Sequence, residues 1–272
     1  MKKRRLWVLT LLSFTVLGLF SSLASAANTF DHGQWDALLK QHVLPLNGGQ
    51  VTQVDYQGFA YDKVPLEGYL AELSQVTQVE FDAWSKDEQL AFLINAYNAW
   101  TVALILTKWP DLDSIKELGR LFSSPWNKSF IPLLGETRSL DDIEHVMIRG
   151  SDRYQDPRIH FAVNCASIGC PALRNQAYTG QQLEAQLEQQ TLLFLEDRSR
   201  NRIEGGKLAL SSIFKWYRED FEKGWKGYDS LEQFLVNYAV SLSLSPEDIK
   251  QLTEKKMSIR FLDYDWALNK TL

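Results

Sequence analysis

The sequence predicts a helix-rich α+β domain with a small, mostly antiparallel sheet. Segments with helix-capping signals are long and numerous, whereas segments rich in β-forming residues are few, short and bounded by turn residues. The chain also has no Pro/Gly/Ser-rich linker, internal repeat or low-complexity run, which indicates one globular domain over residues 27–272.

The first 26 residues have the three parts of a secretory signal peptide. Lys2 to Arg5 are basic, the apolar run LWVLTLLSFTVLGLF follows, and Ala24-Ser25-Ala26 provides small side chains for cleavage. The apolar run has about 15 residues and a membrane-spanning helix needs about 20, so we expect no stable membrane span after cleavage. The sequence therefore predicts an exported protein that resides in the periplasm.

The charge of the chain bears on its partners. The formal net charge is −5, and cleavage after residue 26 removes four basic residues, which leaves −9. Such an acidic surface repels the phosphates of nucleic acids, so nucleic acid is not an expected partner. The expected partner is an unknown small molecule or peptide, and no cofactor is expected.

The longest helix is expected at 86–108. Ser85 and Glu88 have the S-x-x-E spacing of a capping box, and the apolar stretch behind them continues to Pro110. This helix is apolar on nearly all sides, so it should lie in the centre of the domain. Further helices are expected at 30–43, 64–76, from Ser139 to Gly150, from Thr179 onwards, at 212–222, at 230–241 and after Ser245-Pro246.

Strands are expected at fewer places. The segment 158–163, RIHFAV, is rich in β-forming residues, and 202–210 reads as a hairpin around Gly205-Gly206. A late strand is expected at 258–264, and weaker signals lie near 51–58 and 128–133.

The segment RIHFAVNCASIGCPAL, residues 158–173, contains both cysteines of the chain and one of its four histidines. On a strand, His160 would face away from its apolar neighbours Ile159 and Phe161. A histidine beside a thiol can act as the base that generates a thiolate nucleophile. We expect Cys170 to be that nucleophile, because Cys165 continues the apolar side of the strand.

Other arrangements of these side chains stay open. An oxidising compartment and an even number of cysteines favour a Cys165–Cys170 disulfide, and the intervening ASIG turn can bring the two Cα atoms within about 4.4–6.8 Å. A zinc site would use His160 and both cysteines with His145 or a carboxylate. The chain lacks a second closely spaced ligand pair, so no metal is expected. A redox role lacks the C-x-x-C start of a thioredoxin-like helix.

Three polar residues lie near one face of the apolar helix at 86–108, namely Glu88, Asn95 and Asn98. Buried amides need hydrogen-bond partners, so the asparagines could fix the backbone of neighbouring loops. Alternatively, Asn95 or Glu88 orients His160, as the third member of a catalytic triad does. Both interpretations place this helix against the cysteine segment.

Five motifs in order resemble the family called domain of unknown function 547. They are FLINAYNAW, SLDDIEH, HFAVNCASIGCPAL, FKWYREDF and FLDYDWALN, and the resemblance extends from about residue 85 to the C-terminus. The family name implies no activity. A looser analogy of residue types is to papain-like and transglutaminase-like thiol enzymes, although their usual order of cysteine before histidine is not found here.

Two classes of function follow from these observations. In the first, the protein is a thiol-dependent hydrolase or acyl transferase in which Cys170 attacks a carbonyl and His160 moves the proton. Backbone N–H groups of the ASIG turn would hold the oxyanion. In the second, it is a non-catalytic periplasmic binding or assembly protein with a structural disulfide between Cys165 and Cys170.

Overall fold

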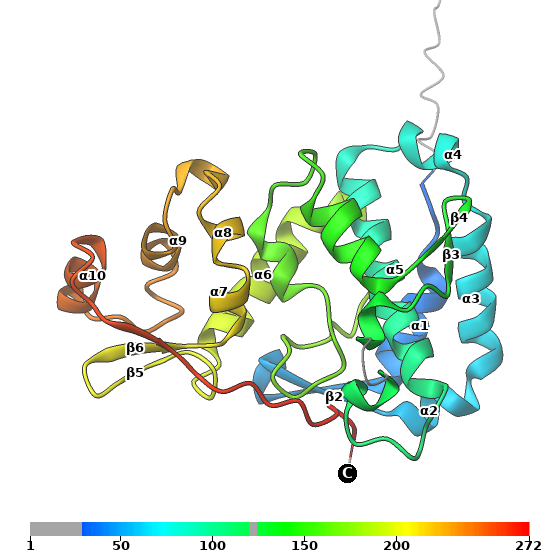
Figure 1. Cartoon of the computed structure of the whole chain (residues 1–272), viewed down its shortest axis with the longest axis horizontal. Coiled ribbons are helices and arrows are strands. Elements are labelled where there is room, and N and C mark those ends of the chain that lie inside the picture. Colours follow the sequence, from blue (N-terminus) through cyan, green and yellow to red (C-terminus); the bar gives the residue numbers. More distant parts are fainter. Residues whose placement is uncertain (1–28, 120–123, 272) are drawn as a thin grey trace, which may run out of the picture.

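The computed structural model describes residues 29–119 and 124–271, and it confirms a helix-rich α+β fold (Figure 1). The signal peptide predicted for residues 1–26 lies outside the described residues. The α-helices are α1 (Gly33–His42), α2 (Tyr56–Tyr61), α3 (Lys63–Gln75), α4 (Gln78–Ala83), α5 (Lys86–Leu106), α6 (Leu183–Glu196), α7 (Ile213–Trp216), α8 (Arg218–Phe221), α9 (Leu231–Asn237) and α10 (Pro246–Thr253).

Tighter and wider helical turns connect these elements. The 3₁₀ helices are η1 (Asn47–Gly49), η2 (Ile115–Leu118), η3 (Pro125–Asn127), η5 (Pro157–Phe161), η6 (Gly180–Gln182) and η7 (Trp225–Gly227). The segment η4 (Asp142–Arg149) is a π-helix. It occupies the helix predicted from Ser139 to Gly150, and the Ser139 hydroxyl and the Asp142 carboxylate cap its start reciprocally.

The strands form three small sheets. β1 (Val43–Leu46) pairs with β2 (Val51–Val54), and β3 (Ile131–Leu133) pairs with β4 (Glu136–Arg138), both antiparallel. β5 (Arg202–Glu204) and β6 (Lys207–Leu210) form the predicted hairpin, and Gly205 and Gly206 have φ of 59° and 72°. β7 (Ile259–Phe261) lies in the predicted late strand and pairs parallel to β6.

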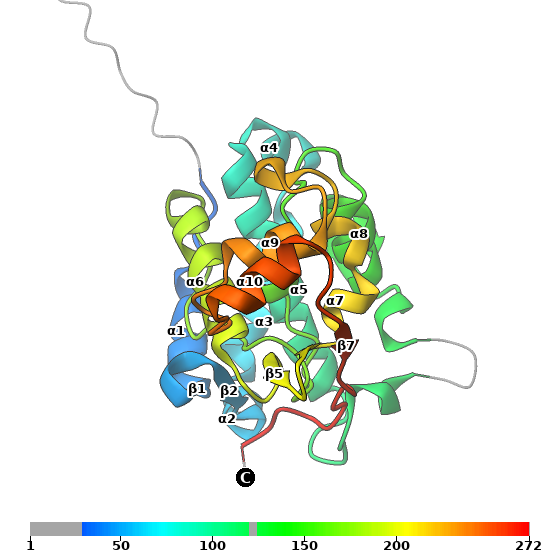
Figure 2. The same ribbon diagram turned by 90° about the vertical axis from the view of Figure 1, so that its left-hand side faces the viewer.

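The apolar side chains form two clusters. The larger contains the buried faces of α1 to α5, and the smaller contains those of α7 to α10 with β6 (Figure 1). Figure 2 shows α9 and α10 at the near end of the molecule, in front of α5. The 3₁₀ helix η5 joins the clusters, because Ile159 packs in the larger one and Phe161 in the smaller one.

Helix α5 is the central element, as its all-round apolar sequence predicts. It contacts α2, α3, α6 and η4, and Phe92 and Leu93 are fully buried. Each such side chain contributes about 1.5–3 kcal/mol to folding through burial. By length and composition α5 could also cross a membrane, but 83% of its most apolar stretch is buried inside the fold.

The strand predicted at 158–163 is wrong, because this segment forms the 3₁₀ helix η5 and its C-terminal continuation. Asp156 accepts a hydrogen bond from the backbone N–H of Arg158, and Pro157 occupies the first helical turn. An aspartate cap followed by proline is a helix-start signal, and it overrides the β propensity of the apolar residues that follow. Consequently Arg158 and His160 do not lie on a solvent-facing side of a strand, and both are buried.

Candidate functional site

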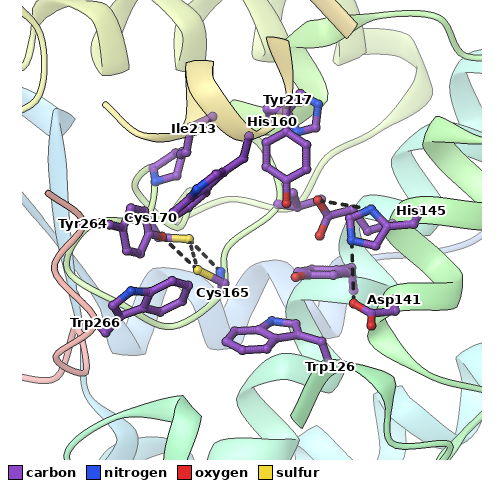
Figure 3. Close-up of a pocket in the computed structure, with 15 residues that line it drawn as sticks. Trp126, Asp141, His145, His160, Cys165, Cys170, Ile213, Tyr217, Tyr264 and Trp266 are labelled. Atoms are coloured by element: carbon purple, nitrogen blue, oxygen red, sulfur yellow. Dashed lines mark hydrogen bonds and ion pairs between the residues drawn. The ribbon is translucent and has the colours of Figure 1, made fainter. Parts of the chain in front are cut away.

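A cavity of about 240 Å³ lies where the two apolar clusters meet the C-terminal segment (Figure 3). One wall carries Cys165 and Cys170, and the opposite wall carries His160 and side chains from η4. Most of the remaining lining is aromatic. The lining residues are Tyr97, Trp126, Asp141, Glu144, His145, His160, Val163, Cys165, Cys170, Pro171, Ile213, Trp216, Tyr217, Tyr264 and Trp266.

The loop that carries the cysteines is fixed by two asparagines. On α5, Asn98 donates to the carbonyl of Ala162 and accepts from the N–H of Asn164. The side chain of Asn164 in turn donates to the carbonyl of Pro171 and accepts from the N–H of Ala166. Because all these groups are buried, losing one partner would leave an unpaired polar group, so the loop conformation is well determined.

The C-terminal segment packs directly on the same loop. The N–H of Gly169 donates to the carbonyl of Asp265, and the N–H of Ile168 donates to the carbonyl of Ala267. A Cβ atom at residue 169 would lie only 2.9 Å from the Asp265 carbonyl oxygen, so glycine is required for this approach. The docking brings the Tyr264 side chain into contact with the cysteines.

Three of the four backbone N–H groups of the ASIG turn, which are predicted to hold the oxyanion, already have acceptors within the protein. Those of Ile168 and Gly169 are bonded to the C-terminal segment, and that of Ala166 is bonded to Asn164. The N–H of Cys170 is bonded to the carbonyl of Ser167. Next to the Cys165 sulfur the structure places two side-chain hydroxyls, those of Ser167 and Tyr264.

The two thiols lie in contact. Their sulfur atoms are 2.6 Å apart, and the backbone N–H of Cys165 donates to the sulfur of Cys170 at 2.8 Å. The Cys165 sulfur also lies 3.1 Å from the Tyr264 hydroxyl and 3.2 Å from the Ser167 hydroxyl. Cys165 is partly exposed and Cys170 is buried.

These surroundings shift the pKa values of the thiols in opposite directions. The hydrogen bond from Cys170 lowers the pKa of Cys165, and the hydroxyls of Ser167 and Tyr264 add to this effect against the burial of the group. Burial raises the pKa of Cys170 well above its ordinary value. The thiolate, which is the reactive form, therefore forms more readily at Cys165 than at Cys170. The sequence predicts Cys170 as the nucleophile, and the directions of the two pKa shifts favour Cys165 instead.

His160 is held by a carboxylate from the other apolar cluster. Its Nε2 lies 2.8 Å from Oδ2 of Asp220, and its ring stacks on Tyr217 at a centroid distance of 3.9 Å. Arg149 and Lys223 also donate to Asp220, and although burial raises the pKa of Asp220, the hydrogen bonds from these three residues lower it far below its usual range. The carboxylate is therefore ionised and can fix the imidazole tautomer.

The tautomer leaves one nitrogen of His160 free to act. Burial lowers the pKa of His160, so the ring is neutral near pH 7, and an Nε2–H that donates to Asp220 makes Nδ1 an acceptor. This Nδ1 is buried and has no hydrogen-bond partner among the described residues. Such an unpaired acceptor is uncommon in a folded interior.

The residues expected to orient His160 have other roles. The Asn95 side chain donates to the carbonyl of Tyr178 and accepts from its N–H. Asn95 therefore fixes the backbone of a neighbouring loop, which is the first of the two roles that the sequence suggests for it. Glu88 lines a separate surface cleft beside Gly180. Asp220 takes the position that orients His160. The motif WYRED contains this residue, but the sequence does not place it at the site, because an aspartate on an amphipathic helix usually lies on the protein surface.

The π-helix η4 supplies an acidic wall. Glu144 is 95% buried, and Asp141 lies one turn before His145, with Oδ1 3.7 Å from Nε2. Arg149 donates from Nη1 to Nδ1 of His145 at 2.8 Å. An arginine can only donate, so Nδ1 of His145 is the acceptor in this hydrogen bond.

The zinc arrangement is not assembled. Within residues 29–119 and 124–271, no group of three or more His, Cys, Asp and Glu side chains is placed to hold a metal ion. The arrangement instead combines a thiol of lowered pKa, a carboxylate-bound imidazole and an adjacent cavity, which are the parts that acyl transfer through a thioester requires.

Comparison with known proteins gives one match. The model of the family described as Protein of unknown function, DUF547, matches residues 81–195, which include α5, η4 and the cysteine loop. The motifs around Asp220 and Tyr264 lie outside the matched range. No curated protein and no solved structure matches the chain.

Proposed function

We propose that this chain, whose residues 81–195 match the model of the family described as Protein of unknown function, DUF547, is a thiol-dependent hydrolase or acyl transferase with Cys165 as its nucleophile. One observation carries the proposal. Cys165 is partly exposed, its sulfur has three hydrogen-bonding neighbours, and the residue lines the same cavity as His160, which Asp220 holds from outside the lining.

The reaction follows the chemistry of a cysteine nucleophile. The Cys165 thiolate attacks the carbonyl carbon of an acyl substrate, a C–S bond forms, and the bond to the leaving group breaks as that group takes up a proton from solvent water. The hydroxyl of Tyr264 donates to the developing negative charge. Water or a second acceptor then attacks the thioester, and Nδ1 of His160 takes its proton, which releases the acyl product and restores the thiolate.

Acyl-enzyme trapping tests this mechanism. The reduced protein is mixed with a panel of p-nitrophenyl esters, and release of nitrophenol and the intact mass of the protein are measured. We expect a burst of nitrophenol and one acyl group located on Cys165. His160→Gln should retain acylation and slow the release of the acyl group by roughly 100-fold, the lower range for loss of a general base.

The matched variants separate the two thiols. Cys165→Ser should abolish the burst, because serine lacks a stable anion at neutral pH. Cys170→Ala should still be acylated, since this thiol only donates to Cys165. Acylation of Cys170 in the wild type, or a burst that persists in Cys165→Ser, would contradict the proposal.

A second candidate function is a non-catalytic binding or assembly protein with a Cys165–Cys170 disulfide. The observation that favours it is the sulfur separation of 2.6 Å, since only a small movement closes a disulfide of about 2.05 Å. The proposed export to the periplasm would provide the oxidising conditions. In this case the cavity remains a binding site, and the thiols stabilise its loop.

Counting free thiols decides between the candidates. The protein is isolated from the periplasm under native conditions, unfolded in a thiol-blocking reagent and analysed by mass. Two free thiols support the enzyme. A disulfide that glutathione at cellular concentration does not reduce supports the binding protein.

A further inference from the structure

The charge of the cavity differs from that of an ordinary apolar pocket. Among the described residues that line it, Asp141 and Glu144 are the ionisable carboxylates, and none is a lysine or an arginine. Of the two lining histidines, His160 is neutral because burial lowers its pKa, and His145 accepts a hydrogen bond from Arg149. The lining therefore presents negative charge without a lysine or an arginine to balance it.

Behind the lining, Asp220 accepts hydrogen bonds from both Arg149 and Lys223, so one of these two positive charges has no carboxylate of its own. Arg149 also donates to His145, but neither Asp220 nor its two basic partners line the cavity. Glu144 itself lies 4.0 Å from the His145 ring. A carboxylate that is 95% buried in such surroundings is costly unless a cation accompanies it.

The aromatic lining adds an independent preference for cations. Six of the fifteen lining residues are tryptophan or tyrosine, and Trp216, Tyr264 and Trp266 contact one another with centroid distances of 4.4–5.8 Å. Lys116 does not line the cavity but places its ammonium 3.7 Å from the centroid of Trp266, as a cation–π pair does. The faces of such rings attract an ammonium group.

A hydrogen-bond acceptor without a partner completes the set. Nδ1 of His160 is buried, lacks a donor among the described residues and belongs to a lining residue. An ammonium group in the cavity can pair with the carboxylate of Glu144, and the His160 ring adds an acceptor that no donor among the described residues satisfies. Carboxylates, aromatic faces and a free acceptor together match an N–H-bearing cation and would repel an anion.

We infer that the cavity binds a ligand that carries a protonated amine. If the protein is the proposed acyl-transfer enzyme, on which this part of the inference rests, its substrate is an acyl compound with an ammonium group near the carbonyl that Cys165 attacks. If the protein is instead a binding protein, the cavity binds the same class of cation.

A pair of probes of nearly equal size tests the inference. Benzylamine is a cation at neutral pH and benzyl alcohol is neutral, so the ratio of their affinities, measured by calorimetry on the full mature chain, reports the preference for charge. We expect the amine to bind at least about tenfold more tightly, and Glu144→Gln to reduce that ratio to about threefold or less. The control Glu67→Gln removes an exposed carboxylate of α3 and should leave the ratio unchanged.

Each outcome decides the inference. Equal binding of the two probes to the wild type overturns it, and this comparison needs no variant to fold. An unchanged ratio in a folded Glu144→Gln protein also overturns it. Because the measurement follows binding and involves no thiol step, a failure here leaves acyl transfer by Cys165 to its own test, and a failure of acyl transfer leaves this one intact.

Discussion

Cys165 and Cys170 lie five residues apart and have opposite chemical character. The reason is local: Cys165 receives hydrogen bonds from Cys170 and two hydroxyls, whereas burial dominates at Cys170. The sequence identifies both thiols and His160 as the candidate site, because these residue types are rare in the chain and lie close together. It cannot rank the thiols, because Tyr264, which distinguishes them, lies 99 positions from Cys165.

A second histidine makes a testable contribution to stability. His32 is 95% buried, its Nδ1 lies 2.7 Å from the Tyr69 hydroxyl, and burial lowers its pKa from 6.5 to about 4. Between these two values the unfolded chain binds the proton and the folded chain does not. Stability from this group is therefore complete above about pH 6.5 and is lost as the pH falls towards 4.

Chemical unfolding at several pH values measures this effect. Between pH 7 and pH 4 the wild type should lose about 3 kcal/mol more free energy of unfolding than His32→Gln, which cannot titrate. The comparison cancels the pH dependence of all other groups. If the free energy of unfolding falls equally with pH in the two proteins, protonation of His32 does not destabilise the folded state.

At the scale of elements, the sequence locates most helices because their caps are local signals. Ser85 before α5 and Ser245 before α10 both accept the hydrogen bond that such caps predict. Two elements differ from the prediction. Residues 157–161 form a 3₁₀ helix because the local Asp156–Pro157 start signal overrides the β propensity of the residues that follow. The segment η4 takes the wide π form, which no sequence period indicates.

The contact between the cysteine loop and the C-terminal segment gives a prediction at this scale. Gly169→Ala places a Cβ atom 2.9 Å from the Asp265 carbonyl oxygen and 3.0 Å from the Tyr264 ring, so the C-terminal segment must move away. We expect a loss of about 1–3 kcal/mol in the free energy of unfolding. Movement of Tyr264 should also slow alkylation of Cys165.

A glycine on a helix provides the control. In α3, a Cβ atom at Gly68 meets only the flexible end of Gln34 at 3.3 Å, so Gly68→Ala should be neutral or should stabilise by up to about 1 kcal/mol through helix propensity. Both variants are compared by urea unfolding and by thiol alkylation. Equal stability of Gly169→Ala and the wild type would show that the docked segment is not tightly held.

At the scale of the whole molecule, the cavity depends on segments that are distant in the sequence. Tyr97 comes from α5, Glu144 from η4, Tyr217 from the α7–α8 junction, and Tyr264 from the C-terminal segment. Spacing along the chain cannot reveal such an arrangement. The sequence therefore predicts the fold class and one wall of the site, whereas the acidic and aromatic walls emerge only from the fold.

The proposed export also concerns the whole chain. If residues 1–26 are a signal peptide, the protein recovered from the periplasm should begin at about Ala27, since the A-S-A sequence precedes that residue. Intact mass of the exported product measures this directly. A product that retains the basic segment Lys2 to Arg5 would instead indicate that the chain stays anchored by its N-terminus.

The pH dependence of thiol alkylation tests the central claim, that Cys165 is the activated nucleophile, most directly. The rate of iodoacetamide reaction with the reduced protein is followed for each cysteine by peptide mass, in the wild type and in Tyr264→Phe. We predict that Cys165 titrates below the free thiol value of about 8.5 and Cys170 above it, and that the loss of the Tyr264 hydroxyl raises the pKa of Cys165. A Cys165 that titrates at or above the free value, or a Cys170 that reacts first, would contradict the account.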